Sequence, residues 1–231
     1  MIDFEQIARG RFAIRPYPWT EIGNLYLIED AAVLAATYPL DHYKTVDGAD
    51  GEKTYVYQAR NFVPMGENRL SFAEALSAAW RRFGEELLSP AYRRAMSELT
   101  GYDLACMPME ANFYHYNPAA HQGPHVDLPA KLVVHIFYFN AAWDVRDGGC
   151  LAVLNSKNPA DVVHLVPPIV GSSAVFIRSD HSWHQVQKVN PGVRESRRAL
   201  VVTFYKPGSP STLWPAHEAP VLGDYIPVGA A

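Results

Sequence analysis

After Leu104 the chain becomes a series of short runs rich in β-branched and aromatic residues, each interrupted by proline, glycine, asparagine or aspartate. Many short strands at this spacing are typical of a β-sandwich or a β-barrel. The expected fold is therefore mainly β. The pattern predicts strands over residues 109–117, 132–140, 151–154, 162–166, 174–177, 183–189 and 197–206.

The first hundred residues carry helical signals instead. Residues 31–38 are rich in alanine and leucine. Ser71 and Glu74 form a capping-box pattern, which predicts a helix from there to about residue 88. Residues 89–101 open with a serine and a proline and close with a glycine, as a capped helix does. Helices first and strands afterwards predict a β-barrel core with the N-terminal helices packed on one face.

The chain shows no internal repeat, low-complexity tract or linker. Its 231 residues are enough for one sizeable domain. We expect a single domain over residues 1–231. Within it we expect a helical lead-in over residues 1–103, a β-barrel core over 104–206 and a proline-rich tail over 207–231 that wraps the surface or covers the mouth of a pocket.

The bulk composition excludes several classes of partner. The formal charge is −4 and the basic residues form no stripe, so we expect no nucleic-acid partner. No run approaches the ~20 apolar residues that a membrane span needs, and the first residues do not form a secretory signal. Cys106 and Cys150 belong to no Cys-x-x-Cys pattern, and we expect them to be reduced thiols in a cytoplasmic protein.

The segment Gly123-Pro124-His125-Val126-Asp127 indicates a metal site. Residues two apart in an extended segment project to the same side, so His125 and Asp127 can direct an imidazole and a carboxylate at one point. His184, which begins a β-type run, is the best candidate for a third ligand. His181 is its rival, but a turn holds a ligand less rigidly than a strand does. Two histidines and a carboxylate leave three positions of an octahedron open, which suits O₂-activating Fe(II).

Further motifs follow in a fixed order. They are Tyr138-Phe139-Asn140, the Gly148-Gly149 turn, Ala174-Val175-Phe176, His184-Gln185-Val186 and Arg197-Arg198-Ala199-Leu200. Together with His-x-Asp, this order resembles the prolyl-4-hydroxylase-like branch of the Fe(II)/2-oxoglutarate oxygenases over about residues 109–206. The run Ser-Asp-x-Ser-Trp-His that ends at His184 is also similar to bacterial amino-acid hydroxylases of this group, which oxidise free or acylated amino acids.

The resemblance implies a double-stranded β-helix, or jelly-roll, with Fe(II) near its open mouth. His125, Asp127 and His184 would hold the metal. The implied co-substrates are 2-oxoglutarate and O₂. The keto-acid end of 2-oxoglutarate would chelate the metal, and its far carboxylate would need a cation deep in the barrel.

Arg197 is the expected cation, because it matches the basic residue on the family's last strand and its planar fork pairs with a carboxylate. Strand alternation places it on one face with small residues, which suits a barrel interior. A register slip would put Arg198 in this role, and Arg194 is a third option. Tyr138 matches the family's tyrosine on the same carboxylate, and Tyr116 is a weaker partner.

The implied reaction is hydroxylation of an unactivated C–H bond, with release of succinate and CO₂. Related halogenases replace the carboxylate ligand with a small residue, so Asp127 disfavours halogenation; desaturation and ring formation stay open. We expect a small-molecule substrate, such as an amino acid or a natural-product intermediate. The polar residues expected near the barrel mouth as substrate contacts are Glu110, Asn112, Arg60 and Trp214.

Three other functions stay open on sequence grounds. A hydroxylase of protein or peptide residues would need an open groove. A non-catalytic cupin-like binding protein would keep the barrel, but it should tolerate loss of a metal ligand, whereas all three ligands and the arginine occur here. Zinc hydrolysis is weaker, because it gives the arginine and the tyrosine no role.

The remaining motifs are expected to be structural. His135 lies on the opposite face of its strand from Tyr138, and Gly148-Gly149 predicts a tight turn with unusual backbone angles. His121 and Gln122 are expected in a solvated loop, with a position beside the ligands or the substrate as the alternative. The histidines expected to be structural are His42, His164 and His217.

Overall fold

The computed structural model describes residues 1–50 and 53–225. Its helices are α1 (Phe4–Ala8), α2 (Ile28–Ala36), α3 (Ala78–Leu88) and α4 (Pro90–Thr100), with the 3₁₀ turns η1 (Ala73–Ala75) and η2 (Val145–Asp147). Its strands are β1 (Trp19–Ile22), β2 (Lys44–Asp50), β3 (Lys53–Val63), β4 (Met109–Tyr116), β5 (His121–His125), β6 (Lys131–Tyr138), β7 (Leu151–Leu154), β8 (Val162–Val166), β9 (Ser173–Ile177), β10 (His184–Val186) and β11 (Arg197–Tyr205). No helix in these ranges is long and apolar enough to cross a membrane.

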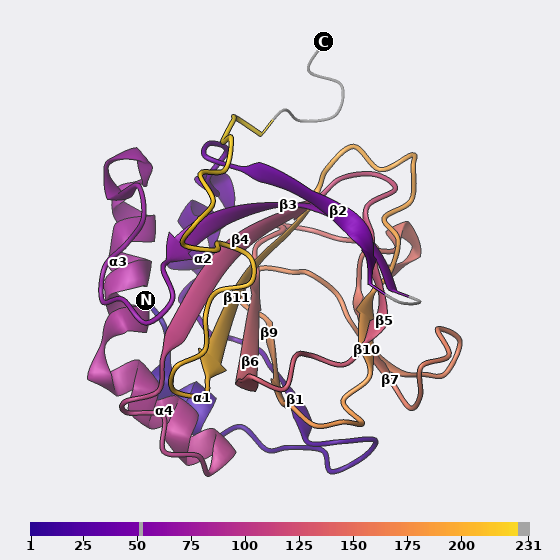
Figure 1. Ribbon diagram of the computed structural model, residues 1–231, viewed down its shortest axis with the longest axis horizontal. Helices are drawn as coiled ribbons and strands as arrows, with labels where there is room; N and C mark the ends of the chain where they lie inside the picture. The colour runs from indigo at the N-terminus through magenta and orange to yellow at the C-terminus, as the bar shows by residue number, and fades with distance from the viewer. Residues whose placement is uncertain (51–52, 226–231) are drawn as a thin grey trace.

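Strands β4 to β11 form two antiparallel layers, and the chain alternates between them except at β7 and β8, which are neighbours in one layer. One layer has the order β9-β6-β11-β4 and the other has the order β5-β10-β7-β8. Figure 1 shows β4 and β11 on one side of the barrel and β5, β10 and β7 on the other. Strands β1, β3 and β2 extend the first layer at its two edges. This alternation confirms the expected double-stranded β-helix.

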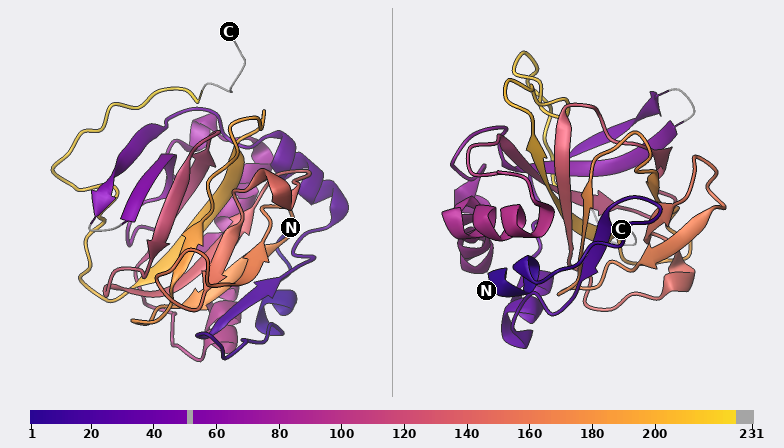
Figure 2. Two further views of the ribbon diagram at one scale, coloured as in Figure 1. Left: turned by 90° about the vertical axis from the view of Figure 1, so that its right-hand side faces the viewer. Right: turned by 90° about the horizontal axis from the view of Figure 1, so that it is seen from below.

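The first layer has one face toward the helices and one toward the barrel interior. Side chains alternate along each strand, so every strand of this layer contributes residues to both faces. On β4, Phe113 is fully buried and packs against Trp80 of α3, with 4.8 Å between ring centroids. On β11, Phe204 packs against Tyr92 of α4 at 6.1 Å. Seen from below in Figure 2, the helices gather on one side of the barrel, as the sequence predicted.

The two long helices differ in how well their starts were predicted. Helix α4 has the predicted Ser89 N-cap and the left-handed Gly101 at its C-cap. Helix α3 begins only at Ala78, where the Ser77 hydroxyl accepts a hydrogen bond from the Trp80 amide. The predicted capping box at Ser71 is wrong, because Ser71 is buried and its hydroxyl donates to Asn61 at 2.5 Å.

The N-terminal hundred residues hold more strand than the sequence analysis predicted. Strands β1, β2 and β3 were not predicted, so the lead-in over residues 1–103 contains strands as well as the expected helices. Within β3, Thr54-Tyr55-Val56-Tyr57 carries the β-branched and aromatic residues that favour strands, so a signal was present. All seven predicted strands after Leu104 are confirmed within about three residues at each end, and β5 adds a strand beside the ligand motif.

The Gly148-Gly149 turn has the unusual backbone that the sequence predicted. The φ angles are +70° and +68°. A Cβ on Gly148 would lie 2.0 Å from the carbonyl oxygen of Lys188, so no side chain fits there. A Cβ on Gly149 would lie 3.7 Å from the Cβ of Arg197, which puts the turn beside a predicted co-substrate residue.

We expect Gly148→Ala to lower the free energy of unfolding by at least ~2 kcal/mol, because left-handed backbone costs an L side chain ~1–2 kcal/mol and the added methyl must also displace a carbonyl. Gly192→Ala is the matched control, since its Cβ would meet nothing within 4 Å. We expect that control to change stability by less than ~0.5 kcal/mol. Urea denaturation measures both values, and equal losses would contradict the turn geometry.

Candidate functional site

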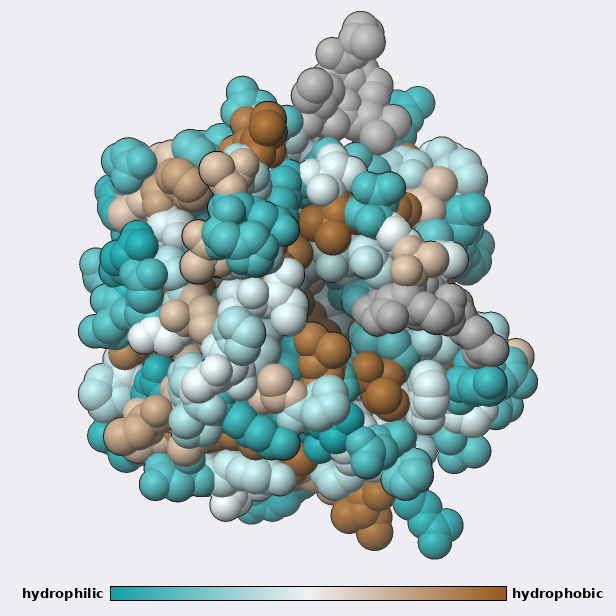
Figure 3. Space-filling model, in the orientation of Figure 1, coloured by the Kyte–Doolittle hydropathy of each residue, from teal (hydrophilic) through white to brown (hydrophobic). Residues whose placement is uncertain are grey.

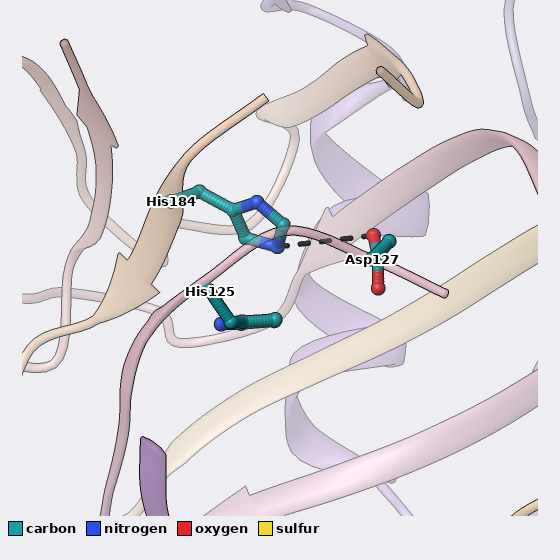
Figure 4. A group of neighbouring side chains, drawn as sticks. All are labelled: His125, Asp127 and His184. Atoms are coloured by element: carbon teal, nitrogen blue, oxygen red, sulfur yellow. Dashed lines mark ion pairs between the residues drawn. The ribbon is translucent and has the colours of Figure 1, made fainter. Parts of the chain in front are cut away.

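The two predicted histidine ligands lie opposite each other on neighbouring strands. His125 ends β5, His184 begins β10, and the antiparallel register pairs them directly. Their ring centroids are 4.2 Å apart. Asp127 follows β5 by two residues, and its Oδ2 lies 3.8 Å from Nε2 of His184 (Figure 4). The ligand atoms of the three residues all lie within 4.8 Å of one another, so the structure brings the predicted triad together.

Hydrogen bonds to backbone carbonyls fix both imidazole rings. Nδ1 of His125 donates to the carbonyl of Gly123, and Nδ1 of His184 donates to that of Ser182, each at 2.9 Å. A proton on Nδ1 leaves the lone pair on Nε2 for a metal ion. The three ligand side chains are between 5% and 8% exposed, so an ion bound here would be largely shielded from water.

Both carboxylate oxygens of Asp127 have a defined direction. Oδ2 faces His184, and Oδ1 accepts a hydrogen bond from Nζ of Lys131 at 2.5 Å. Arg178 Nε donates to the backbone carbonyl of Asp127 at 3.1 Å, which fixes the loop after β5. Burial alone would raise the pKa of Asp127, but Lys131 and the two imidazoles hold that pKa well below its usual range. The carboxylate is therefore ionised.

This donor set fits iron(II). Two imidazole nitrogens and one carboxylate oxygen on one face of the ion match the arrangement of non-haem Fe(II) oxygenases, which keep the remaining positions open for ligands. The triad borders a cavity of about 630 Å³, so small molecules can reach the open positions. Figure 3 shows the hollow between the two layers on the face of Figure 1. Besides the triad, the cavity is lined by residues of both layers, among them Tyr57, Tyr114, Tyr116, Lys131, Leu151, Phe176, Trp183, Arg197 and Val201.

Arg197 lies in the same cavity as the triad, and the sheet register explains its neighbours. It pairs with Tyr116 across β4 and β11, while Tyr138 pairs with Ala199 two residues further along β11. The guanidinium carbon lies 4.8 Å from the Tyr116 ring centre and 5.3 Å from that of Tyr138. Arg197 is 1% exposed and Tyr138 is fully buried.

The polar atoms around Arg197 are incompletely satisfied. Nε of Arg197 and the hydroxyl of Tyr138 are buried and make no hydrogen bond within the described part of the chain. Unpaired buried polar groups are costly, and such groups in a native structure call for a missing partner. A carboxylate at this position would accept from both residues, so the cavity fits a 2-oxo diacid.

The two rival arginines lie elsewhere. Arg198 points away from the cavity, and its Nη1 donates to the carbonyl of Ala35 in α2 at 3.2 Å. Arg194 is exposed on the loop before β11. The rival ligand His181 is exposed and is absent from the described metal-ligand cluster.

The four predicted substrate contacts do not line the cavity. Glu110 accepts from Ser211 at 2.5 Å, and Asn112 accepts from the indole of Trp214 at 2.7 Å, so both bind the C-terminal tail to β4. Arg60 lies fully buried on the helix-facing side of β3, where its Nε donates to Asp41 at 3.1 Å. The structure therefore gives these four residues other contacts.

Several cavity residues were not identified from the sequence. Tyr114 shares the strand parity of Tyr116, so alternation along β4 could have found it. Tyr57 lies on β3, which was missed. Lys131 begins β6 at a register irregularity, so its direction could not be read from alternation. Gln122 was expected in a solvated loop, but it lies in β5, lines the cavity and accepts a hydrogen bond from Tyr116 at 3.1 Å.

The other histidines have local partners. His135 is buried and pairs with the hydroxyl of Tyr92 at 3.1 Å, as a structural residue would. His121 lies 2.8 Å from the hydroxyl of Thr54 on β3. His164 pairs with Glu21 at 2.8 Å near the surface.

Comparison with known proteins agrees with this geometry. Residues 109–206 match the model of the 2OG-Fe(II) oxygenase superfamily. The fold is similar to a Pseudomonas putida prolyl-4-hydroxylase (TM-score 0.57, 19% identity, covering 88% of this chain and 96% of that one). It is also similar to a Trichoplax adhaerens prolyl hydroxylase in complex with a hypoxia inducible factor peptide fragment (0.55, 14%, 87% and 88%). A third similar structure is the α-ketoglutarate-dependent epimerase SnoN from nogalamycin biosynthesis (0.53, 14%, 97% and 94%). No curated protein matches this chain significantly in sequence.

We expect His184→Ala to weaken binding of a divalent metal at least ~100-fold, because it removes one of three ligands from a buried site. His181→Ala is the matched control, three residues away and outside the cluster. Titration of the metal-free protein with Co(II), followed by its visible ligand-field bands, measures both variants. If His181→Ala is as damaging as His184→Ala, the ligand assignment is wrong.

Proposed function

We propose that this chain is a 2OG-Fe(II) oxygenase that hydroxylates an unactivated C–H bond of a small molecule, on the basis of the match over residues 109–206. The enzymes of this superfamily use Fe(II), 2-oxoglutarate and O₂, and they release succinate and CO₂. The observation that carries the proposal is the presence of the triad and Arg197 in one cavity.

In this proposal His125, Asp127 and His184 hold the iron. Bound Fe(II) and 2-oxoglutarate supply the O₂-dependent oxidation. The protein supplies binding, orientation and a shielded site, as is general for cofactor enzymes. The carbonyls of Gly123 and Ser182 keep a proton on Nδ1 of each histidine, so each Nε2 stays a ligand.

Arg197 is proposed to pair with the far carboxylate of 2-oxoglutarate. A guanidinium presents parallel N–H donors that match the two carboxylate oxygens. The rings of Tyr116 and Tyr138 flank the guanidinium, and the Tyr138 hydroxyl adds a donor. The buried position makes this ion pair stronger than it would be in water.

Lys131 is proposed to orient Asp127 by holding its second oxygen. A carboxylate with one oxygen engaged by an ammonium presents the other oxygen to the metal in a fixed direction. The retained carboxylate also argues for hydroxylation over halogenation, which needs a vacant ligand position there.

A cavity of about 630 Å³ is within the range of small-molecule sites, and this supports a small substrate over a polypeptide. The main alternative is hydroxylation of a peptide residue, since two of the similar folds are prolyl hydroxylases. In that case 2-oxoglutarate turnover would be stimulated only by a polypeptide that contains the residue and not by a small molecule. A non-catalytic cupin-like protein would give no turnover with either class.

The organisation proposed for the chain is one domain over residues 1–231, located in the cytoplasm. One large hydrophobic cluster supports the proposal of a single domain. It joins residues of α1, α3 and α4 to the helix-facing sides of β4, β6 and β11.

Anaerobic addition of Fe(II) and 2-oxoglutarate should produce the weak visible metal-to-ligand charge-transfer band of a chelated keto acid. Succinate should then form under air when substrate is supplied. Absence of both the band and succinate would contradict the proposed activity and favour the non-catalytic alternative.

We expect Arg197→Leu to raise the dissociation constant for 2-oxoglutarate at least ~30-fold, because truncating one partner of a buried charge pair costs ~2 kcal/mol or more. Arg198→Leu is the control on the neighbouring residue, whose side chain points toward α2. The charge-transfer band, titrated with 2-oxoglutarate, measures both constants. A larger effect of Arg198→Leu would show that the assigned strand register is wrong.

A further inference from the structure

The cavity wall formed by β3, β4 and the start of β6 carries hydrogen-bond donors beyond those that the proposed iron and 2-oxoglutarate sites use. Tyr57 lies on β3, Tyr114 on β4, and Lys131 begins β6. All three line the same cavity as the metal ligands. They lie on the side of the barrel opposite β7 and β10, so one small molecule can contact this wall and the open metal positions together.

The two tyrosines form a pair with available hydroxyls. Their ring centroids are 5.3 Å apart, with the rings at 66° to each other. Neither hydroxyl has a hydrogen-bond partner within residues 1–50 and 53–225. Both side chains are half-buried, so each hydroxyl reaches the cavity without being fully solvated. A ligand atom that accepts hydrogen bonds is the natural partner.

Lys131 adds a positive charge to the same wall. One of its N–H groups donates to Asp127, and an ammonium group has further donors. Burial raises the pKa of the Tyr57 phenol, and the positive charge of Lys131 acts in the opposite direction. Glu110 is the other nearby carboxylate, but it accepts from Ser211 and Tyr205 and does not line the cavity.

The described cavity lining offers no unengaged carboxylate to pair with a substrate cation. Asp127 is its one carboxylate there, and both Asp127 oxygens are directed at Lys131 and the metal position. A buried ammonium without a paired negative charge is costly. A free amino acid would place such a group in this cavity, and the expected substrate contacts Glu110 and Arg60 do not line it.

The remaining lining fits a hydrocarbon frame. Leu151, Phe176 and Trp183 contribute apolar or aromatic surface, and Phe176 packs 4.5 Å from the ring of His184. A molecule with one anionic end and an apolar body would use both kinds of wall.

From this arrangement we propose that the substrate is an organic carboxylate without a free ammonium group, whose carboxylate binds Lys131 and the hydroxyls of Tyr57 and Tyr114. The proposal rests on the proposed oxygenase function, because it assigns the substrate end of that site. It concerns a second anion position, separate from the one that Arg197 provides.

Two matched sets of probes test the charge preference. The first set is hydrocinnamate, hydrocinnamamide, L-phenylalanine and phenethylamine, and the second is hexanoate, hexanamide, norleucine and hexylamine. Calorimetry on protein loaded with Mn(II) and saturating 2-oxoglutarate measures binding without turnover. We expect each carboxylate to bind ~10-fold or more tightly than its amide, since hydrogen bonds to charged groups contribute ~1.5–3 kcal/mol. The amino acids and amines should bind more weakly than the carboxylates.

Variants of the wall test the residues. Tyr57→Phe and Tyr114→Phe should each weaken carboxylate binding ~5- to 10-fold and leave amide binding nearly unchanged, because they remove only a hydroxyl. Tyr102→Phe is the control, on a side chain that is 42% exposed. Lys131→Met should abolish the preference for carboxylate over amide, whereas loss of metal positioning alone would weaken both probes equally. Lys206→Met, at an exposed lysine, is its control.

Three results with the binding probes would overturn the proposal. Equal binding of carboxylate and amide, tightest binding of an amine, or no binding of either carboxylate at millimolar concentration would each do so. If the tyrosine variants raise the 2-oxoglutarate dissociation constant as Arg197→Leu does, this wall holds the co-substrate and the proposal is also wrong. If no charge-transfer band forms, the oxygenase proposal fails separately, and the same calorimetry on the metal-free protein still measures the carboxylate preference.

Discussion

The antiparallel pairing of β5 with β10 is the constraint on which the metal site depends. Residues directly opposite each other in such a ladder lie ~4.5–5.5 Å apart and project to the same side. That geometry turns His125 and His184, distant in sequence, into adjacent ligands. Slippage by one residue would send one imidazole to the other face of the sheet. Strand β10 is short, but β7 holds it from the other side, which fixes the register.

The barrel also buries two charged side chains, Arg197 and Asp127, in positions where ligands of opposite charge can pair with them. The structure buries Arg197 without a carboxylate partner within the described residues, and an unpaired buried cation is destabilising by several kcal/mol in general. Asp127 is ionised and offers Oδ2 to a cation. Metal and diacid together would satisfy both groups, so the native state should be most stable when loaded. These buried charges therefore lower the stability of the ligand-free protein and raise its affinity for the metal ion and the diacid.

Local sequence patterns pointed to the residues of the proposed metal centre, whereas they did not point to those of the proposed substrate wall. His125 and Asp127 could be recognised because two-residue spacing in a strand is a local property, and Arg197 because alternation along one strand gives its direction. The expected substrate contacts have other partners in the structure, for a reason that is not local in sequence. Glu110 and Asn112 have the right strand parity, but the C-terminal tail occupies them, and that contact joins residues about a hundred positions apart. The predicted start of helix α3 was too early, because the Ser71 hydroxyl donates to Asn61 on β3 and does not cap a helix.

The residues of the proposed metal and co-substrate site and those of the proposed substrate wall come from different parts of the chain. The metal ligands and Arg197 all fall within residues 109–206, the part that matches the superfamily. Tyr57 comes from β3, which lies before that part and pairs with both β4 and β5. A change in β3 can therefore alter the cavity wall while the pairing of β5 with β10 stays intact. Because the two proposed functions rest on different strand pairs, the oxidation chemistry and the substrate preference can change independently of each other.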